Sequence, residues 1–205
     1  KLHRPRVTAE LVVRPRLLVA LDQGLTRPMT VVIAPAGFGK STLVSSWAAD
    51  LELGRRPDSS IVPSAWVTLD ETDSDLNTFL HYFIGALRTV FPTAATDTLS
   101  LLAGLRQPPP DLLANTLSND IEGLPSPFVM VLDDIHVIHD QSVFDFLINW
   151  VRHWPRQLHL ILISRHDPAL PLSTLRAKGR LTEVRARSLR FTRDETIVYL
   201  EQQLG

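Results

Sequence analysis

The sequence contains no cysteine among its 205 residues, which excludes disulfide bonds and thiolate metal sites and fits a reducing compartment. It also lacks an excess of either charge, because 21 basic and 22 acidic residues leave a formal net charge of -1. Such a balance gives no overall positive field to hold nucleic acid. No apolar run approaches a membrane span, and the first residues lack the apolar core of a signal peptide. We therefore expect a cytoplasmic chain that neither contacts a membrane nor binds DNA directly.

Internal repeats and low-complexity tracts are also missing, and a composition of 44% hydrophobic and 21% charged residues suits one compact domain. We expect this domain to span residues 1–205, with residues 1–28 as an amino-terminal arm packed on it. The chain starts at Lys1 rather than at a methionine and stops at Gly205 within a helical pattern. We therefore expect it to be a piece of a longer protein.

Short apolar runs rich in β-branched residues alternate with longer amphipathic segments. The short runs predict strands at Met29–Ala34, Ser64–Leu69, Phe128–Asp133, Leu158–Ile163 and Leu181–Ala186. The longer segments predict helices at Pro15–Gly24, Lys40–Leu53, Asp75–Phe91, Pro110–Gly123, Gln141–Trp154 and Arg193–Leu204. Two of the strands are apolar on both faces, as parallel strands covered by helices on both sides must be. The alternation predicts an α/β layered fold with a central parallel sheet.

Two helix starts carry capping residues. Asp73 and Ser74 are candidates for the N-cap of the helix near residue 75, whose apolar residues recur at spacings of three and four. Thr192 and Glu195 have the spacing of a capping box at the start of the last helix. We interpret both as local structure only.

A glycine-containing loop connects the first expected strand to the helix that follows it. Its sequence over Ala34–Ser41, APAGFGKS, matches the pattern G-x-x-x-x-G-K-[ST] except that alanine replaces the first glycine. Gly37 and Gly39 can adopt positive φ, so that successive backbone N–H groups point into one concavity at the amino end of a helix. The loop therefore predicts a phosphate-binding site made largely of backbone, although a tight strand-to-helix connection remains the alternative.

The side chains after the loop fit the same chemistry. Lys40 would reach the β and γ phosphates, Ser41 would ligate magnesium, and Thr42 would lie near the α phosphate. The predicted nucleotide-binding residues of this region are Ala36, Gly37, Phe38, Gly39, Lys40, Ser41 and Thr42.

Two carboxylates end the apolar run FVMVLDD. In a parallel sheet all carboxyl ends open on the same rim, so we expect Asp133 beside Ser41 despite the long separation in sequence. Asp133 would hold magnesium, and Asp134 would orient or deprotonate an attacking water. The alternative is that both residues merely terminate a strand.

The next strand ends in Ser164 and Arg165 on the same expected rim. Arg165 can act as a sensor of the γ phosphate or can be a solvated loop residue. His136 and His139 have no further metal-type partners nearby and are interpreted as ordinary residues of a loop or helix edge. The four tryptophans are expected in the core rather than on a base-stacking surface.

These segments resemble the ATP-binding domain of MalT-like, LuxR-type transcriptional regulators, within the signal-transduction ATPases with numerous domains (STAND). The likeness runs almost the whole length, through LVVRPRLLVAL, VVIAPAGFGKSTLVSSWA, VMVLDDIHVI and SRHDPALPLSTLRAKG. Loops of that family commonly begin with alanine, as this one does at Ala34. The motifs RPRLL and SRHDPALPLSTLRAKG are more specific than the phosphate loop, which many NTPases share.

The resemblance implies an AAA-like P-loop NTPase fold, a three-layer sandwich with a five-stranded parallel sheet. It implies that Arg14, Pro15 and Arg16 lie near the base of the nucleotide. It also implies the order of the strands across the sheet. Named by their last residues, the strands lie in the order 69, 133, 163, 33 and 185. It also implies a switch in which ADP favours a closed form, whereas an inducer and ATP favour an open, self-associating form. The longer proteins continue into a winged-helix element, a helical-repeat sensor and a DNA-binding helix-turn-helix.

Three functions are compatible with these observations. The first is a regulatory module that binds ATP or ADP with Mg²⁺, hydrolyses ATP slowly and biases self-assembly, with Lys40, Asp134 and Arg165 as its catalytic residues. The second is a turnover ATPase or a kinase, for which Arg176 or Arg180 would be a weakly supported trans-acting arginine. The third is an interaction domain whose loop has lost its nucleotide. The first is preferred because Lys40, Ser41 and Asp133 are all present.

Overall fold

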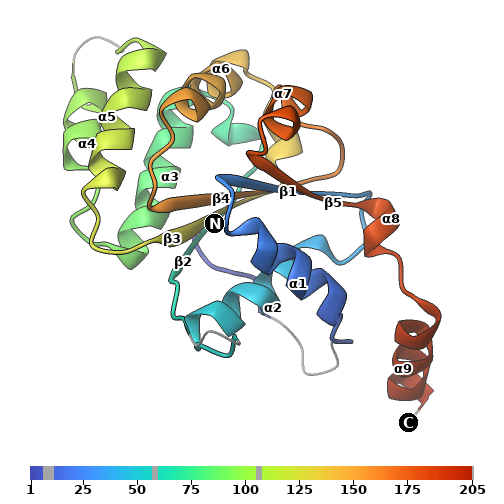
Figure 1. Cartoon of the computed structure of the whole chain (residues 1–205). Helices are drawn as coiled ribbons and strands as arrows, with labels where there is room; N and C mark the ends of the chain where they lie inside the picture. The colour runs from blue at the N-terminus through green and yellow to red at the C-terminus, as the bar shows by residue number, and fades with distance from the viewer. Residues whose placement is uncertain (7–11, 57–59, 105–107, 205) are drawn as a thin grey trace.

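Five parallel strands form one sheet at the centre of the molecule. The computed structural model describes residues 1–6, 12–56, 60–104 and 108–204. The strands are β1 (Met29–Ile33), β2 (Ser64–Thr68), β3 (Phe128–Asp133), β4 (Leu158–Ser164) and β5 (Leu181–Arg185). Their order is β2-β3-β4-β1-β5, which is the order that the resemblance implied. All four strand pairs are parallel, so the carboxyl ends of the strands share one edge, on the side of α8 in Figure 1.

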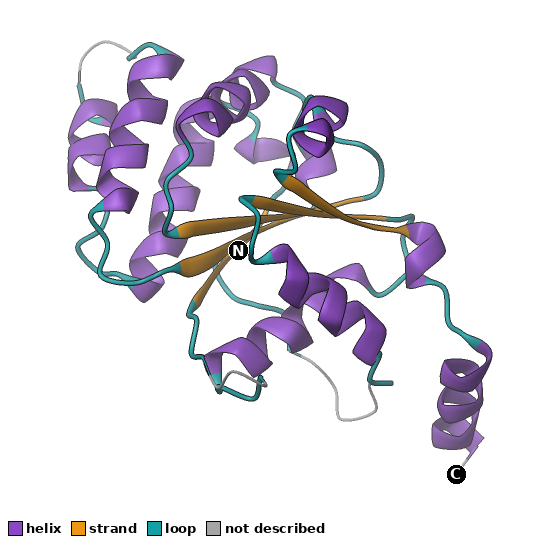
Figure 2. Ribbon diagram, in the orientation of Figure 1, coloured by secondary structure: helices purple, strands orange, loops and turns teal. Residues whose placement is uncertain are grey.

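Helices cover both faces of this sheet, which confirms the predicted three-layer sandwich (Figures 1 and 2). One face carries α3 (Leu76–Val90), α4 (Thr96–Leu102), α5 (Pro110–Glu122), α6 (Gln141–Trp150) and α7 (Leu172–Ala177). The opposite face carries α1 (Pro15–Gly24) and α2 (Lys40–Glu52), and α8 (Ala186–Leu189) follows β5 at its end. The last helix, α9 (Arg193–Leu204), projects from the body of the molecule.

Alternating side chains of the strands divide the core between these two faces. Along β1, Val31 belongs to the cluster under α3, α5 and α6, whereas Val32 packs with α1 and α2. The same alternation holds on β3 for Met130 and Val131. Every residue of β1, β3 and β4 is buried, which explains why these strands are mainly apolar in the sequence. Trp47, Trp66 and Trp150 are buried and Trp154 is partly buried, as predicted.

Several element boundaries differ from the sequence-based expectation. Asp75, rather than Asp73 or Ser74, is the N-cap of α3, and its carboxylate accepts from the Asn77 amide at 3.0 Å. Asp73 instead closes a capping box with Asp70 on a preceding 3₁₀ turn. The predicted box of Thr192 and Glu195 is present, with backbone-to-side-chain bonds in both directions.

Three short helices were not predicted, and one predicted helix was too long. The helix near residue 141 ends at Trp150 and continues as a 3₁₀ turn over Val151–His153. The unpredicted α4, α7 and α8 have seven, six and four residues. Elements of this length contain too few turns for an apolar periodicity to be recognised. Within the described residues, no helix has the length and apolar character of a membrane span.

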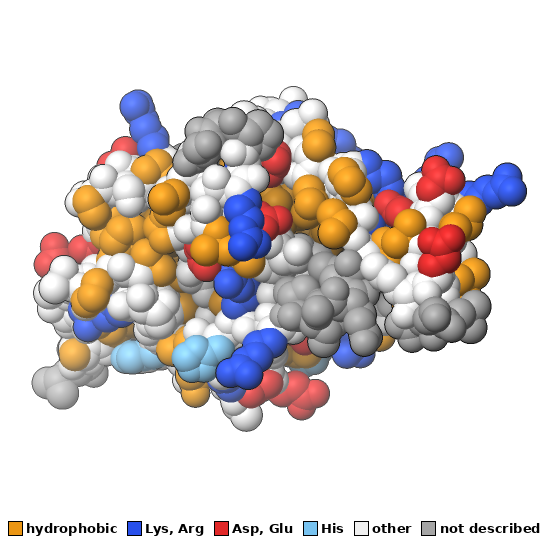
Figure 3. All heavy atoms as spheres, turned by 90° about the horizontal axis from the view of Figure 1, so that it is seen from below, with side chains coloured by type: hydrophobic (Ala, Val, Ile, Leu, Met, Phe, Trp, Pro, Cys, Tyr) orange, Lys and Arg blue, Asp and Glu red, His pale blue; other side chains and the backbone are white. Residues whose placement is uncertain are grey.

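The first residues pack on the edge of the domain through ionic contacts. The ammonium group of Lys1 lies 2.8 Å from Asp73 Oδ1, and Arg4 pairs with Glu52 at 2.8 Å. On the face that carries α1 and α2, basic and acidic side chains are interspersed rather than separated (Figure 3). Ile197 and Leu200 of α9 are exposed.

Candidate functional site

The loop between β1 and α2 has the backbone conformation that its glycines allow. Gly37 has φ +83° and Gly39 has φ +70°, both in the left-handed region that other residues rarely adopt. Gly39 is the N-cap of α2 and offers no capping side chain, so the first N–H groups of this helix have no side-chain acceptor there. The helix dipole and these N–H groups favour an anion at this position.

Lys40 lies at the start of α2 with its side chain folded back onto the loop. Its ammonium group donates to the carbonyl oxygen of Pro35 at 3.1 Å. Burial lowers the pKa of Lys40, whereas the charges of Asp134 and Asp133 oppose this shift. The lysine is therefore a nearly buried cation beside the concavity of the loop.

Ser41 and Asp133 meet at the carboxyl edge of the sheet. The hydroxyl group of Ser41 donates to Asp133 Oδ1 at 3.0 Å, although 92 positions separate the two residues. Burial raises the pKa of Asp133 to about 6, and the charge of Asp134 adds to the rise, while the bond from Ser41 opposes it. The structure thus brings together the two side chains that strand direction placed on one rim.

Asp134 has an unusual backbone conformation for a residue that is not glycine. Its φ of 59° and ψ of 35° lie in the left-handed region, and its amide donates to Asp133 Oδ1 at 3.0 Å. Such conformations cost of order 1 kcal/mol and gather at functional sites. The Asp134 carboxylate lies 3.6 Å from Nδ1 of His136, too far for a hydrogen bond.

Arg165 follows β4 and is exposed on the same edge of the sheet. Its positive charge is close enough to lower the pKa values of both Lys40 and His136, for which burial is the larger cause. The rings of His136 and His166 meet edge to face at 5.7 Å. Among the described residues no group of three or more possible metal-ligating side chains occurs, and His136 and His139 therefore stay outside any such cluster.

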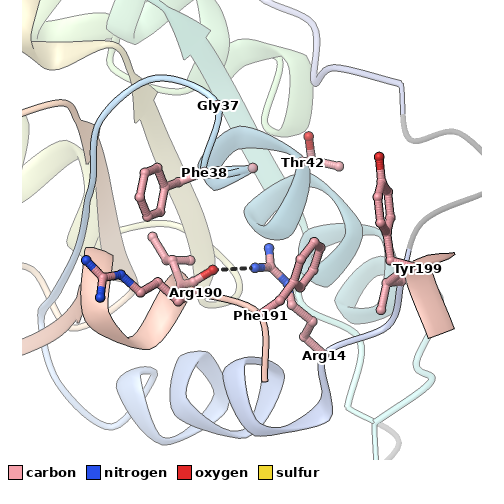
Figure 4. Close-up of a pocket in the computed structure, with 10 residues that line it drawn as sticks. Arg14, Gly37, Phe38, Thr42, Arg190, Phe191 and Tyr199 are labelled. Carbon is pink, nitrogen blue, oxygen red and sulfur yellow. Dashed lines mark hydrogen bonds between the residues drawn. The ribbon is translucent and has the colours of Figure 1, made fainter. Parts of the chain in front are cut away.

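A cavity of about 380 Å³ opens beside the loop, between α2 and the segment from α8 to α9 (Figure 4). Gly37, Phe38, Gly39 and Thr42 line it from the loop and α2. Its other lining residues come from both ends of the chain and are Val12, Arg14, Leu189, Arg190, Phe191 and Tyr199.

Arg14 crosses this cavity at the amino end of α1. Its guanidinium group donates to the carbonyl oxygen of Leu189 at 3.0 Å and lies 5.4 Å from the ring centre of Phe191 (Figure 4). A Cβ atom on Gly39 would lie 3.4 Å from this guanidinium group. Burial lowers the pKa of Arg14, and the charge of Glu195 opposes the shift.

Pro15 and Arg16 do not line the cavity. Pro15 opens α1 at a position that needs no backbone N–H. Arg16 instead binds α9, because its guanidinium group donates to both carboxylate oxygens of Glu195 at 2.9 and 2.8 Å. Of the three residues of this motif, only Arg14 lines the cavity, and their place near a base stays a prediction.

Two aromatic lining residues were missed from the sequence. Phe191 and Tyr199 stack with ring centres 5.7 Å apart, and both project from the carboxyl-terminal segment in Figure 4. Their spacing of eight residues is shared by many helix faces. The only local signal was the capping box at Thr192, which fixes where α9 begins but not what its side chains face.

Comparisons with known proteins bear on the family resemblance and on the fold. No protein-family model matches the chain. The HTH-type transcriptional regulator MalT of Yersinia pestis (strain Pestoides F) is 30% identical over 205 residues, which is 100% of this chain. MalT of Cronobacter sakazakii is 30% identical over 206 residues. The resemblance to the MalT-like regulators is confirmed. The chain spans 22% of the length of these MalT relatives.

Solved structures confirm the P-loop NTPase fold. Cdc6p of Pyrobaculum aerophilum matches with a TM-score of 0.59 and 16% identity over 98% of this chain and 52% of its own. The ORC1 protein of Aeropyrum pernix, solved in complex with DNA, matches with a TM-score of 0.53 and 16% identity over 93% of this chain and 47% of its own. At this identity the likeness concerns the fold alone.

Proposed function

We propose that this part of a MalT-like regulator binds ATP or ADP with Mg²⁺ and acts as a nucleotide-dependent switch that hydrolyses ATP slowly. The observation that carries the proposal is the 3.0 Å hydrogen bond between Ser41 and Asp133 beside the left-handed glycines of the loop. A hydroxyl, a carboxylate and a row of free N–H groups at one helix start form a donor and acceptor set suited to a metal–phosphate group.

The donor set also fits magnesium. Mg²⁺ prefers oxygen ligands and often takes only one or two from protein, with phosphate oxygens and water completing its shell. Ser41 and Asp133 would hold it, and the bound ion would neutralise charge on the phosphates. Because the pKa of Asp133 is about 6, its carboxyl group is mostly ionised at pH 7 and available as a ligand.

Lys40 and Asp134 have distinct parts in the proposed hydrolysis. Lys40 would exchange the carbonyl oxygen of Pro35 for phosphate oxygens and stabilise the charge that develops there. Asp134, held by its left-handed backbone beside Asp133, would orient the attacking water and accept its proton. Arg165, which is exposed on the same rim, would contact the terminal phosphate.

In the proposed switch, the cavity would connect the loop after β1 to the segment from α8 to α9. A base in the cavity would touch Phe38 on the loop and Phe191 or Tyr199 on the far side. Nucleotide would thereby bind two parts of the chain that are otherwise joined at this point by Arg14 and Arg16. A bound state shifts an equilibrium only through unequal affinity for its two forms. Self-assembly of the longer protein would follow from such a difference between ATP and ADP.

Steady-state ATP hydrolysis distinguishes the switch from a turnover enzyme. Switch NTPases hydrolyse at roughly 10⁻⁴ to 10⁻² s⁻¹ without a partner, whereas kinases turn over at about 1 to 100 s⁻¹. We expect a rate in the lower range, with Asp134→Asn slower still and Asp140→Asn, a cap on α6, unchanged. A rate above about 1 s⁻¹ would contradict the switch. The candidate trans-acting arginines are engaged within the chain, Arg176 with Glu183 and Arg180 with the Val151 carbonyl.

A further inference from the structure

A second cavity lies at the opposite edge of the sheet, where the strands begin. Its volume is about 490 Å³, within the range of sites for small organic ligands. Pro28, Pro127 and Pro155 line it just before β1, β3 and β4, and Trp154 and Phe128 add aromatic surface. This edge is remote from the phosphate loop, which follows the carboxyl end of β1.

Three arginines give this cavity a positive charge. Arg27 donates to the carbonyl oxygen of Leu181 at 2.7 Å, and Arg180 donates to that of Val151 at 2.9 Å. Both bonds are to neutral groups and leave the charges uncompensated. The side chain of Arg156 makes no hydrogen bond or ion pair with any described residue. None of the described lining residues is acidic.

A buried polar atom in the same lining also lacks a partner. The Oε1 atom of Gln157 is buried and accepts no hydrogen bond from the described residues. An acceptor left in this state costs about 1–3 kcal/mol unless another donor satisfies it. The ring of His159 does not meet this need, because its two nitrogens are occupied by the Arg27 carbonyl and the Thr30 hydroxyl.

We propose that this cavity is a binding site for a small organic anion, separate from the nucleotide site. The ligand would carry a carboxylate or phosphate for Arg27, Arg156 and Arg180, an N–H or O–H donor for Gln157, and an apolar body against Trp154. Arginines that have no acidic partner favour planar anions, because the N–H groups of the guanidinium form a fixed fork. The volume argues for a small molecule rather than a protein surface.

Nuclear magnetic resonance titration of the ¹⁵N-labelled 205-residue chain tests this site. The probes are N-acetylphenylalanine, phenyl phosphate and the uncharged N-acetylphenylalaninamide. We expect the two anions to cause saturable shifts of the Trp154 indole N–H signal and of the Gln157 side-chain NH₂ signals. The uncharged N-acetylphenylalaninamide should cause none. The tighter of the two anions identifies whether carboxylate or phosphate is preferred. The Gly37 and Gly39 amides report separately on the phosphate loop.

Arg156→Gln is the decisive variant, because this side chain makes no hydrogen bond or ion pair with the described residues. This variant should bind the two anions about fivefold more weakly or worse, since a charge-assisted hydrogen bond is lost. Arg152→Gln is the matched control, because Arg152 is equally exposed, lies four positions earlier and is not part of this lining. The proposal is wrong if neither anion gives saturable shifts at about 10 mM, a range that covers millimolar binding. It is also wrong if shifts are confined to the loop, if the amide binds equally, or if Arg156→Gln binds as the wild type does.

Discussion

Asp133 is an acidic residue held in surroundings that disfavour its charge. Its side chain is 3% exposed, and it accepts hydrogen bonds from the Ser41 hydroxyl and the Asp134 amide. Burial nevertheless dominates and raises the pKa to about 6. The position therefore destabilises the empty domain at neutral pH, which is typical of a residue kept for binding rather than for folding.

The raised pKa has a consequence for stability. Between about pH 4 and pH 6 the folded state holds the Asp133 proton more tightly than the unfolded state, so this residue lowers the free energy of unfolding as pH rises, by up to about 3 kcal/mol. Asp133→Asn should therefore stabilise the chain more at pH 7 than at pH 4 in urea unfolding. An equal effect at both pH values would contradict the shift.

The comparison between variant and wild type is essential here. His159 acts in the opposite direction, because burial lowers its pKa to about 4 and stability is gained as pH rises from about 4 to about 6.5. In the wild type, the pH-dependent contributions of Asp133 and His159 to the free energy of unfolding largely cancel. The contribution of Asp133 is therefore obtained from the difference in stability between Asp133→Asn and the wild type at each pH.

The Ser41 hydroxyl is expected to act through the metal. Ser41→Ala should weaken ATP binding about tenfold when Mg²⁺ is present and change it little without Mg²⁺, because only a metal ligand is lost. Calorimetric titration in both conditions measures this difference. Ser46→Ala, on the same helix and outside the nucleotide cavity, is the control. An equal loss with and without Mg²⁺ would show that Ser41 does not act as a ligand.

At the scale of elements, α9 is attached to the domain by few contacts. Its described apolar side chains are exposed, and its polar contacts with the rest of the chain include those from Arg16 to Glu195 and the capping box of Thr192. Helices with so little buried surface depend on such polar contacts for their position.

Arg16→Gln should therefore loosen α9 selectively. We expect faster hydrogen exchange of the amides in residues 193–204 and a loss of global stability below about 1 kcal/mol, because the pair is partly solvent-exposed. Exchange measured by mass spectrometry tests this. The control is Arg193→Gln, which alters an exposed arginine whose side chain has no hydrogen bond or ion pair with the described residues. Unchanged exchange in α9 would show that the Arg16 contact does not hold the helix.

Sequence patterns identified the long elements because buried strands and amphipathic helices have distinct periodicities. They also placed Asp133 beside Ser41, since parallel strands end on one edge. The aromatic wall of Phe191 and Tyr199 could not be predicted, because its position depends on how β5 and α8 direct the chain across the loop. The N-cap of α3 was expected at Asp73 or Ser74 rather than Asp75 for a similar reason, since several neighbouring residues are suitable caps and only the backbone selects among them.

The two cavities of the molecule lie at opposite ends of the strands of its sheet. The cavity beside the loop after β1 lies at the carboxyl edge and the arginine-lined cavity at the amino edge, and β1 contacts β4 and β5 between them. In the order β2-β3-β4-β1-β5, β1 has a neighbouring strand on each side, so the loop that follows it begins at an interior strand of the sheet. Asp133 ends β3, which is separated from β1 by β4. The site is therefore held by the most buried part of the fold.

We propose that the loop after β1 is a working phosphate-binding site. Isothermal titration calorimetry of the chain with ATP and Mg²⁺ tests it most directly, with Lys40→Ala beside Lys178→Ala, an exposed lysine at the end of α7. We predict micromolar binding by the wild type and by Lys178→Ala, and binding at least about a hundredfold weaker by Lys40→Ala, because its charge-assisted phosphate contacts are lost. Equal affinity of Lys40→Ala and the wild type would contradict the account.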